Sequence, residues 1–173
     1  MATVSRSPAP LGMLMGIVGF VAGSLMFSLW LARLSGVDLR RVGDGNPGAV
    51  NAFRAAGFLI GSLALLLDFL KGWLPAAAAY RLLGLRGWWL LPALVAPVLG
   101  HAFSPFLRLR GGKAIATTFG VWSGVTLWEV PCLLGGMLVV GKFVLRLGDD
   151  WSTFVALALM PAYLIFCVIR SRR

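Results

Sequence analysis

The chain has 173 residues, of which 59% are hydrophobic and 13% are charged, and its formal net charge is +10. This composition excludes a disordered chain, which needs low hydrophobicity, and it leaves too little polar surface for a water-soluble globule. The basic excess does not indicate a nucleic-acid binder, because such a domain gathers its cations on one solvated face. Here the cations separate long apolar runs, so the sequence indicates a membrane protein with no nucleic-acid partner.

Five long apolar stretches follow one another along the chain, and three of them carry no charged residue. Each is close to or above the roughly 18 residues that suggest a bilayer span. Backbone polar groups inside hydrocarbon need internal partners, so we expect helices. The predicted fold is an all-α, polytopic membrane helix bundle that forms a single domain over residues 1–173. Its expected spans are residues 11–32, 57–81, 88–104, 116–146 and 151–169.

The first and fourth stretches each leave a choice. The first follows Arg6 and could imitate a signal peptide, but its apolar run is too long for one, so we expect a retained span. The fourth is long enough for one tilted helix or for two short helices that meet at Glu129-Val130-Pro131. A carboxylate in the middle of a span is costly, so we expect Glu129 to cap a broken helix or to meet an arginine.

The basic residues set the expected orientation, because Lys and Arg are enriched in cytoplasmic loops. They gather in residues 33–56, 105–113 and 170–173. With five spans, these three segments all fall on the cytoplasmic side, which places the N-terminus outside and the C-terminus in the cytoplasm.

The first cytoplasmic loop combines glycines with groups that bind anions. Glycines let backbone N–H groups approach an anion closely, and an arginine can bind a phosphate or carboxylate through two hydrogen bonds. An ordinary Gly/Asn/Pro turn beside a membrane is the alternative interpretation of this loop alone. The residues concerned are Gly43, Gly45, Asn46, Gly48, Asn51 and Arg54.

The second cytoplasmic loop has a similar composition. Gly111 and Gly112 stand between Arg110 and Lys113, directly before an expected helix, which is typical of a phosphate-binding loop. The spacing is not that of a Walker loop, and basic residues at a membrane face also suit a topology signal or an anionic-lipid contact. Two such loops on one side of a small bundle favour a site for two phosphate-bearing groups.

Three motifs follow one another between roughly residues 20 and 125. The first reads G-S-L-M from Gly23, then V-D-L-R-R and G-D-G-N-P-G-A-V-N-A-F-R. The second reads D-F-L-K-G from Asp68, and the third reads L-G-H from Leu99 and R-G-G-K-A-I-A-T-T from Arg110. In order and spacing the sequence resembles the bacterial acyl-phosphate:glycerol-3-phosphate acyltransferases, small integral membrane enzymes that make lysophosphatidic acid.

The resemblance implies an enzyme of phospholipid biosynthesis in the plasma (inner) membrane of a bacterium. It would transfer a fatty acyl group from acyl phosphate to the hydroxyl of glycerol 3-phosphate, giving lysophosphatidic acid and phosphate without a metal or other cofactor. Expected around the two phosphates are Gly45, Asn46, Gly48, Arg54, Gly111, Gly112 and Lys113. Expected to assist the attacking hydroxyl are His101, Asn51 and Ser24. Expected to shape the site are Asp44, Asp68, Lys71 and Glu129.

Some of these residues also have purely structural interpretations. A lone histidine at the end of a span, such as His101, is often a hydrogen-bonded structural residue. Asp68 and Lys71 stand one helical turn apart and would pair to reduce the cost of charge in the bilayer. A metal site has little to be built from, since His101 is the only histidine and neither cysteine stands in a CxxC motif.

The sequence also departs from the family pattern. Asp44 stands where the family has serine, Val50 where it has threonine and Met26 where it has proline. A carboxylate in a phosphate site repels substrate unless it is protonated or paired, for instance with Arg40 or Arg41. The histidine and asparagine of the family's C-terminal region have no counterpart, so we expect this chain to be shorter by about one span and a tail. A catalytically impaired relative that binds phosphorylated lipid precursors, or a small membrane transporter, is the alternative function.

Overall fold

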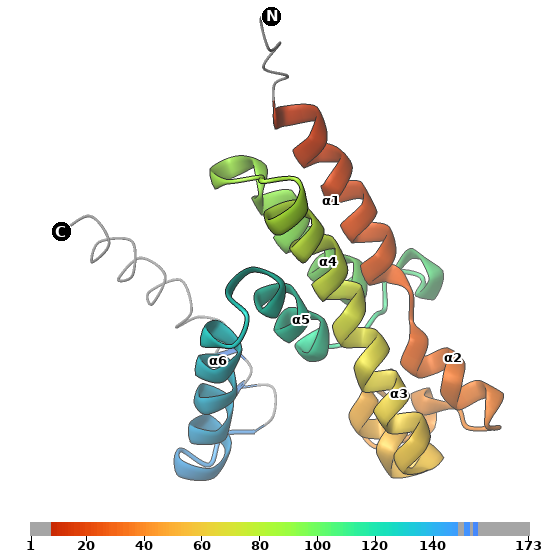
Figure 1. Ribbon diagram of the computed structural model, residues 1–173. Coiled ribbons are helices and arrows are strands. Elements are labelled where there is room, and N and C mark those ends of the chain that lie inside the picture. The colour runs from red at the N-terminus through yellow and green to blue at the C-terminus, as the bar shows by residue number, and fades with distance from the viewer. Residues whose placement is uncertain (1–7, 149–150, 153, 156–173) are drawn as a thin grey trace, which may run out of the picture. The chain divides into compact units, whose positions relative to one another are not determined.

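The computed structural model describes residues 8–148, 151–152 and 154–155. All regular structure in this part of the chain is helical, as the sequence predicts (Figure 1). The span expected at 151–169 falls almost wholly outside the described residues. Two compact units divide the chain, Met1–Val125 and Thr126–Arg173, and the expectation of a single domain stays a prediction.

Six α-helices and five short helical turns are found in the described residues. The α-helices are α1 (Pro8–Ser24), α2 (Phe27–Leu34), α3 (Ala49–Ala77), α4 (Leu91–Ala102), α5 (Ile115–Thr126) and α6 (Glu129–Val139). The short turns are η1 (Leu39–Arg41), η2 (Ala78–Leu82), η3 (Gly87–Trp89), η4 (Pro105–Leu107) and η5 (Val140–Val144). Within the first unit, α1, α3 and α4 pack against one another (Figure 1).

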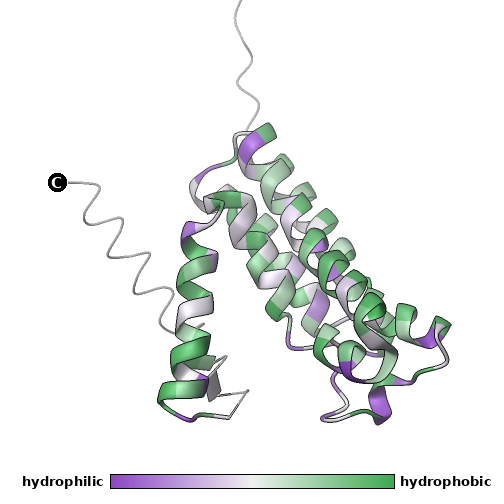
Figure 2. Ribbon diagram, turned by 60° about the horizontal axis from the view of Figure 1, so that its bottom comes forward, coloured by the Kyte–Doolittle hydropathy of each residue, from purple (hydrophilic) through white to green (hydrophobic). Residues whose placement is uncertain are grey.

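Three helical stretches of the described chain are long and apolar enough to cross a membrane, namely Pro8–Leu34, Ala49–Leu82 and Gly87–Leu107. They correspond to the first three expected spans. Hydrophobic residues cover the helix bodies, and hydrophilic residues concentrate at helix ends and in the connecting loops (Figure 2). This pattern is what a lipid environment requires of helices that cross it.

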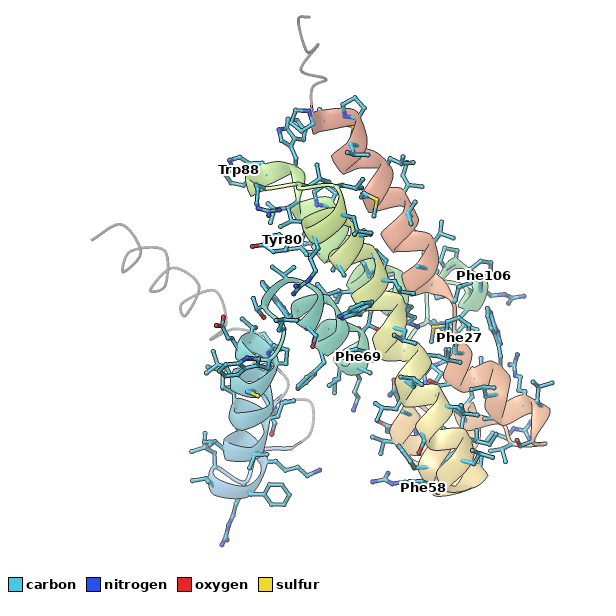
Figure 3. All side chains as sticks on the ribbon, in the orientation of Figure 1. Phe27, Phe58, Phe69, Tyr80, Trp88 and Phe106 are labelled. Carbon is cyan, nitrogen blue, oxygen red and sulfur yellow. The ribbon has the colours of Figure 1, made fainter. Side chains whose placement is uncertain are left out.

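Large apolar side chains point outward from the first unit. Phe58 and Trp88, at opposite ends of this unit, are 82% and 83% exposed (Figure 3). Met13 on α1 and Val95 on α4 are also exposed. Because water disfavours such a continuous apolar surface, it fits contact with lipid and supports the membrane assignment.

Small residues set the packing of α1 on α4. Gly12, Gly16, Gly19 and Gly23 are all buried on α1, and a Cβ at Gly23 would collide with the carbonyl oxygen of Pro97. Helices in lipid associate through such close backbone approach, since lipid tails give no hydrophobic drive between helices. Glycine is therefore needed at this contact because any side chain would push the two helices apart.

The first span is interrupted between α1 and α2. Leu25 and Met26 leave the helical path there, and the interruption exposes backbone carbonyl groups that need partners. The Ser104 hydroxyl donates to the carbonyl oxygen of Ser24 at 2.7 Å. The side chain of Lys71 donates to the carbonyl oxygen of Leu25 at 2.6 Å. The break is thus stabilised by one side chain from α3 and one from the connection between α4 and η4.

An ion pair supports this break from α3. Lys71 Nζ lies 2.8 Å from Asp68 Oδ1, and both side chains are almost fully buried. The hydroxyl of Ser28, at the start of α2, donates to the other oxygen of the same carboxylate. The pairing predicted from the spacing of Asp68 and Lys71 is confirmed, and it links α3 to both sides of the break.

The fourth expected stretch, residues 116–146, forms two short helices rather than one. Leu127 adopts a positive φ of 61° between α5 and α6, so the helix stops just before the expected junction. Pro131 lies in the first turn of α6, where a missing N–H is tolerated. Glu129 is exposed in the same turn, where a carboxylate favours the helix dipole. The expectation of two short helices that meet near Glu129, with this carboxylate at the helix break, is therefore confirmed.

Candidate active site

The two glycine-rich loops meet at one edge of the first unit, as the sequence predicts. Lys113 Nζ lies 2.9 Å from Asp44 Oδ2, and the backbone N–H of Lys113 donates to Asn46 Oδ1 at 3.2 Å. Arg40 adds a third link, because its guanidinium donates to the carbonyl oxygen of Arg110. Residues far apart in the sequence therefore form a single loop junction.

Asp44 is paired, but its partner is on the other loop. The sequence suggested Arg40 or Arg41, whereas the structure shows Arg41 paired with Asp38 at 3.5 Å and Asp44 paired with Lys113. Sequence proximity misled the prediction because the loop turns the Asp44 carboxylate toward the second loop.

The Asp44 carboxylate collects donors from three groups. Besides Lys113, the side-chain amide of Asn51 donates to Asp44 Oδ1 at 2.8 Å, and the backbone N–H of Asn46 donates to the same oxygen at 3.1 Å. These bonds, the one from Lys113 foremost, hold the pKa of the Asp44 carboxyl well below its usual value. Asp44 is therefore ionised at neutral pH.

Asn51 organises the first loop. Its Nδ2 lies 3.0 Å from the Val42 carbonyl oxygen, 2.8 Å from Asp44 Oδ1 and 3.0 Å from the Asn46 carbonyl oxygen, and its side chain is buried. The turn at Gly43 has a positive φ of 56°, and a Cβ there would lie 2.8 Å from Asn51 Oδ1, so glycine is required. Its amide nitrogen thus supports the loop, and the predicted contact of Asn51 with a substrate hydroxyl stays a prediction.

The glycine pair of the second loop packs on the end of α4. Gly111 N–H donates to the Ala102 carbonyl oxygen at 2.9 Å, and Gly112 N–H donates to the His101 carbonyl oxygen at 3.1 Å. These bonds satisfy carbonyl groups that a helix C-terminus leaves open. A Cβ at Gly111 would collide with the His101 carbonyl oxygen, so glycine is needed for the close approach.

The glycine amides of these loops donate to backbone carbonyl oxygens in this structure, and their predicted place around the phosphates stays a prediction. In the first loop, Gly45 N–H donates to the Val42 carbonyl oxygen at 2.9 Å and Gly48 N–H donates to the Asn46 carbonyl oxygen at 2.8 Å. The amides of the second-loop glycines are used in the same way. Sequence composition cannot reveal which carbonyl oxygen will lie beside a loop amide, and here the fold supplies one in each case.

A cavity of about 620 Å³ opens at the loop junction. Its polar lining residues are Asn46, Ser62, Asp68, His101 and Lys113. Its larger apolar lining residues are Val50, Leu65, Leu66, Phe69, Ile115 and Phe119. Phe69 lies where α3 passes α5 (Figure 3). The cavity is thus polar beside the loops and apolar along α3 and α5.

Two helices begin at this cavity. Gly48 and Ala49 line it at the start of α3, and Ala114 and Ile115 line it at the start of α5. A helix N-terminus carries partial positive charge on N–H groups without intrahelical partners, and Gly48 provides no side-chain cap. Together with the ammonium group of Lys113, which is paired with Asp44, these two helix starts supply positive charge to the polar end of the cavity.

His101 links α4 to the cavity. Its side chain is 3% exposed, and its Nδ1 lies 3.3 Å from Thr117 Oγ1 on α5. A Cβ at Gly112 would lie 2.5 Å from His101 Nε2 and 3.2 Å from Asn46 Oδ1, so Nε2 faces the loop junction. Thr117 therefore fixes the ring and directs the second nitrogen toward the cavity. Sequence reasoning missed Thr117, because nothing in the spacing shows that it meets the histidine.

Other expected site residues lie away from the cavity lining. The Ser24 hydroxyl donates to the Phe20 carbonyl oxygen at 2.7 Å, so Ser24 belongs to the helix break. Arg54 is exposed beside the first-loop turn, where a Cβ at Gly43 would lie 3.4 Å from its Nη1. Glu129 belongs to the second unit. Among the described residues, no three His, Cys, Asp or Glu side chains gather as a metal site would need.

The sequence matches the family model described as Glycerol-3-phosphate acyltransferase over residues 13–171. The chain belongs to this family. The assignment predicted from the three motifs is confirmed. As the structure shows, the motifs of this glycerol-3-phosphate acyltransferase family member contribute the loop junction, the helix break and the polar end of the cavity.

Curated relatives carry the same name. The chain is 46% identical over 119 residues to Glycerol-3-phosphate acyltransferase 1 of Thermotoga maritima, an alignment that covers 68% of this chain and 59% of the relative. It is 39% identical over 146 residues to the Glycerol-3-phosphate acyltransferase of Aquifex aeolicus, with 84% of this chain and 72% of the relative covered. The matched region thus spans less than two thirds of the Thermotoga maritima relative.

Solved structures share the fold. PlsY, described as an integral membrane glycerol 3-phosphate acyltransferase, matches in its glycerol 3-phosphate form with a TM-score of 0.74 and 36% identity, covering 88% of this chain and 78% of PlsY. Its lysophosphatidic acid form matches with a TM-score of 0.75 and 33% identity, covering 92% and 77%. The predicted all-α integral membrane fold is therefore confirmed.

Proposed function

We propose that this protein transfers a fatty acyl group from acyl phosphate to the hydroxyl of glycerol 3-phosphate, giving lysophosphatidic acid and phosphate. The observation that carries this proposal is one cavity that has Lys113 and two helix starts at the loop junction and is apolar along α3 and α5. Acyl phosphate has the matching shape, since it joins a dianionic head to an apolar chain. The names of the relatives and the two ligand forms of PlsY support the same reaction.

The polar end of the cavity is the proposed site for the phosphate of one substrate. Lys113 supplies a full positive charge there, and the starts of α3 and α5 supply partial charges. Arg54 is exposed beside the turn at Gly43 and is proposed to bind the second phosphate through its planar guanidinium. The loop glycines that were expected around the phosphates act indirectly, by allowing the backbones to approach closely enough to place these groups; they are Gly45, Gly48, Gly111 and Gly112.

The apolar part of the cavity is the proposed site for the acyl chain. Leu65 and Leu66 line it from α3 and are 45% and 51% exposed at the outer surface of the first unit. An acyl chain bound against these leucines would stay partly in contact with lipid, so little of its apolar surface would be exposed to water. Phe69 and Phe119 complete the wall nearer the loops.

The chemistry needs no acyl-enzyme, because an acyl phosphate is already an activated acid. The oxygen of the glycerol 3-phosphate hydroxyl attacks the carbonyl carbon, the bond from that carbon to the phosphate oxygen breaks, and the departing phosphate takes the proton. His101 Nε2 is placed to hydrogen-bond the hydroxyl. Lys113 stabilises the negative charge that grows on the leaving phosphate.

The membrane orientation is part of the proposal. We place the protein in the inner membrane of a bacterium with the loop junction in the cytoplasm, where a water-soluble substrate such as glycerol 3-phosphate reaches it. The basic residues of both loops, including Arg40, Arg41, Arg108 and Arg110, are exposed, as the positive-inside rule favours. Cysteine labelling of a loop position in right-side-out and inverted vesicles tests this orientation.

The reaction is tested with the purified full chain, acyl phosphate and glycerol 3-phosphate. We expect phosphate release together with lysophosphatidic acid, and strong losses in the Lys113→Ala and Arg54→Ala variants. Arg41→Ala is the matched control, because Arg41 is an exposed loop arginine paired with Asp38. Equal turnover in wild type and Lys113→Ala would contradict the proposed site.

A second candidate function is binding of phosphorylated lipid precursors without acyl transfer. The ion pair between Asp44 and Lys113 favours it, since it occupies the cation that the reaction needs. Substrate binding without product, with turnover restored in Asp44→Ser, would support this function. Substrate flux into proteoliposomes without lysophosphatidic acid would instead support a transporter.

A further inference from the structure

The loop junction already contains an anion of its own. The Asp44 carboxylate lies at 2.9 Å from Lys113 Nζ and also accepts hydrogen bonds from Asn46 N–H and the Asn51 amide. An ammonium, a backbone N–H and a side-chain amide are the kinds of donor that bind a phosphate. One residue of the chain thus satisfies the donors that an entering phosphate would need.

The pair is not required to hold the two loops together. Arg40 donates to the Arg110 carbonyl oxygen and Lys113 N–H donates to Asn46 Oδ1, and both links are independent of the Asp44 carboxylate. The side chains of Lys113 and Asp44 are 31% and 50% exposed. Exposed ion pairs contribute little to stability because water and salt compete for both charges. A solute anion can therefore compete for the lysine.

Lys113 lines the cavity, whereas Asp44 is half-exposed and is not among the residues that line it. A phosphate bound at Lys113 would bring its charge close to the Asp44 carboxylate, and two anions so close repel each other. The carboxylate must then either turn away or weaken substrate binding. Its half-exposed position allows it to turn into water.

We infer that Asp44 is an internal competitor of the substrate phosphate, which occupies Lys113 until a phosphate monoester or acyl phosphate displaces it. Asp44 thereby sets the affinity of the site for dianionic substrates. This inference rests on the proposed function for the identity of the site. It predicts that removal of the Asp44 charge strengthens phosphate binding, the opposite of what the loss of a binding residue would do.

The experiment measures binding rather than turnover. The full chain in nanodiscs is titrated calorimetrically with inorganic phosphate, glycerol 3-phosphate and acetyl phosphate in separate arms, which shows which substrate uses Lys113. Asp44→Asn keeps an oxygen that accepts from Asn46 and Asn51 but removes the charge. We expect it to bind at least one of the phosphates about tenfold more tightly, as removal of a nearby like charge allows.

Two controls make the result specific. Asp38→Asn removes a second acid from the same loop, one that pairs with Arg41 and accepts from Arg40 N–H, and it should change phosphate affinity by less than about twofold because Asp38 does not contact Lys113. In a Lys113→Gln background, Asp44→Asn should lose most of its effect, since the two residues would no longer compete. Thermal unfolding of each variant confirms that it is folded.

Unchanged or weaker phosphate binding in folded Asp44→Asn would overturn the inference and leave the proposed function standing. An equal gain from Asp38→Asn would also overturn it, because general loop charge would then explain the effect. Phosphate binding by neither wild type nor Asp44→Asn would overturn both the inference and the proposed site. These outcomes separate the role of Asp44 from acyl transfer itself.

Discussion

Two Asp–Lys ion pairs among the described residues have surroundings that differ in almost every respect. Asp68 and Lys71 are one helical turn apart, and their side chains are 3% and 2% exposed. Asp44 and Lys113 come from separate loops, and their side chains are 50% and 31% exposed. The distances are nearly equal, 2.8 and 2.9 Å, so environment rather than geometry separates the two.

Environment gives the pairs different roles. A buried pair is costly to break, because removing one partner leaves an uncompensated charge, and this one also stabilises the α1–α2 break through Leu25 and Ser28. An exposed ion pair contributes little to folding stability, and its charged groups exchange partners readily. The buried pair therefore supports the fold around the cavity, whereas the pair of Asp44 and Lys113 is suited to open when a phosphate arrives.

The largest expected effect is at the buried pair. Lys71→Met leaves Asp68 charged in an apolar interior and removes the donor to the Leu25 carbonyl oxygen, so we expect a loss of about 3–5 kcal/mol of stability. Thermal unfolding in detergent measures it. The double variant Asp68→Asn/Lys71→Met should recover most of the loss, because neutral replacements of a buried pair are often tolerated. A single variant as stable as wild type would show that the pair does not support the break.

The next effect is on catalysis at the exposed pair. Lys113→Ala should reduce acyl transfer by about 10²–10³-fold, as the loss of one charge-stabilising donor does in other enzymes. Its stability should stay close to that of wild type, since the Lys113 side chain is partly exposed. Steady-state kinetics and thermal unfolding on the same preparation separate the two quantities. A large loss of stability with full activity would reverse the roles that we assign to the two pairs.

A smaller effect is expected where the loop meets His101. Gly112→Ala would place a methyl group 2.5 Å from His101 Nε2 and 3.2 Å from Asn46 Oδ1, so the loop must shift, and we expect about tenfold less activity. Gly136→Ala is the matched control, because a Cβ there has no atom within 4 Å among the described residues. Kinetics of both variants check the prediction, which fails if both lose activity equally.

The smallest effect is the contribution of Asp44 to stability. Asp44→Asn should change the free energy of unfolding by less than about 1 kcal/mol at neutral pH. The pKa of the Asp44 carboxyl is lower in the folded state than in the unfolded state, where it is about 3.9. The stabilisation by the charged carboxylate is therefore fully present above the unfolded-state pKa. It is lost as the pH falls from there through the folded-state pKa. The difference between wild type and variant, followed by thermal unfolding from pH 7 to pH 3, should decline only below about pH 4. If the stability difference between wild type and variant already declined at pH 6, the titration of another group would be responsible for it.

Hydropathy and charge were enough to predict the helices, the three stretches that are long and apolar enough to cross a membrane, and the meeting of the two basic loops. These features follow from where charged residues interrupt apolar runs. The buried partnership of Asp68 with Lys71 was predictable for a similar reason, because helical spacing alone brings the two side chains together.

Long-range contacts could not be predicted in the same way. The partner of Asp44, the acceptors of the Gly111 and Gly112 amides and the contact between His101 and Thr117 all depend on how separate segments meet. Composition showed that both loops had anion-binding groups, but it did not show that the fold itself uses most of the loop amides. The positive charge at the polar end of the cavity comes instead from Lys113 and two helix starts.

The most direct test of the account is a structure of the full chain with glycerol 3-phosphate or a non-hydrolysable acyl phosphate analogue bound. We predict phosphate oxygens within hydrogen-bond distance of Lys113 Nζ, at the starts of α3 and α5, with the Asp44 carboxylate turned away from the lysine. A phosphate bound elsewhere, with the Asp44–Lys113 pair intact, would contradict the assignment of the loop junction as the substrate site.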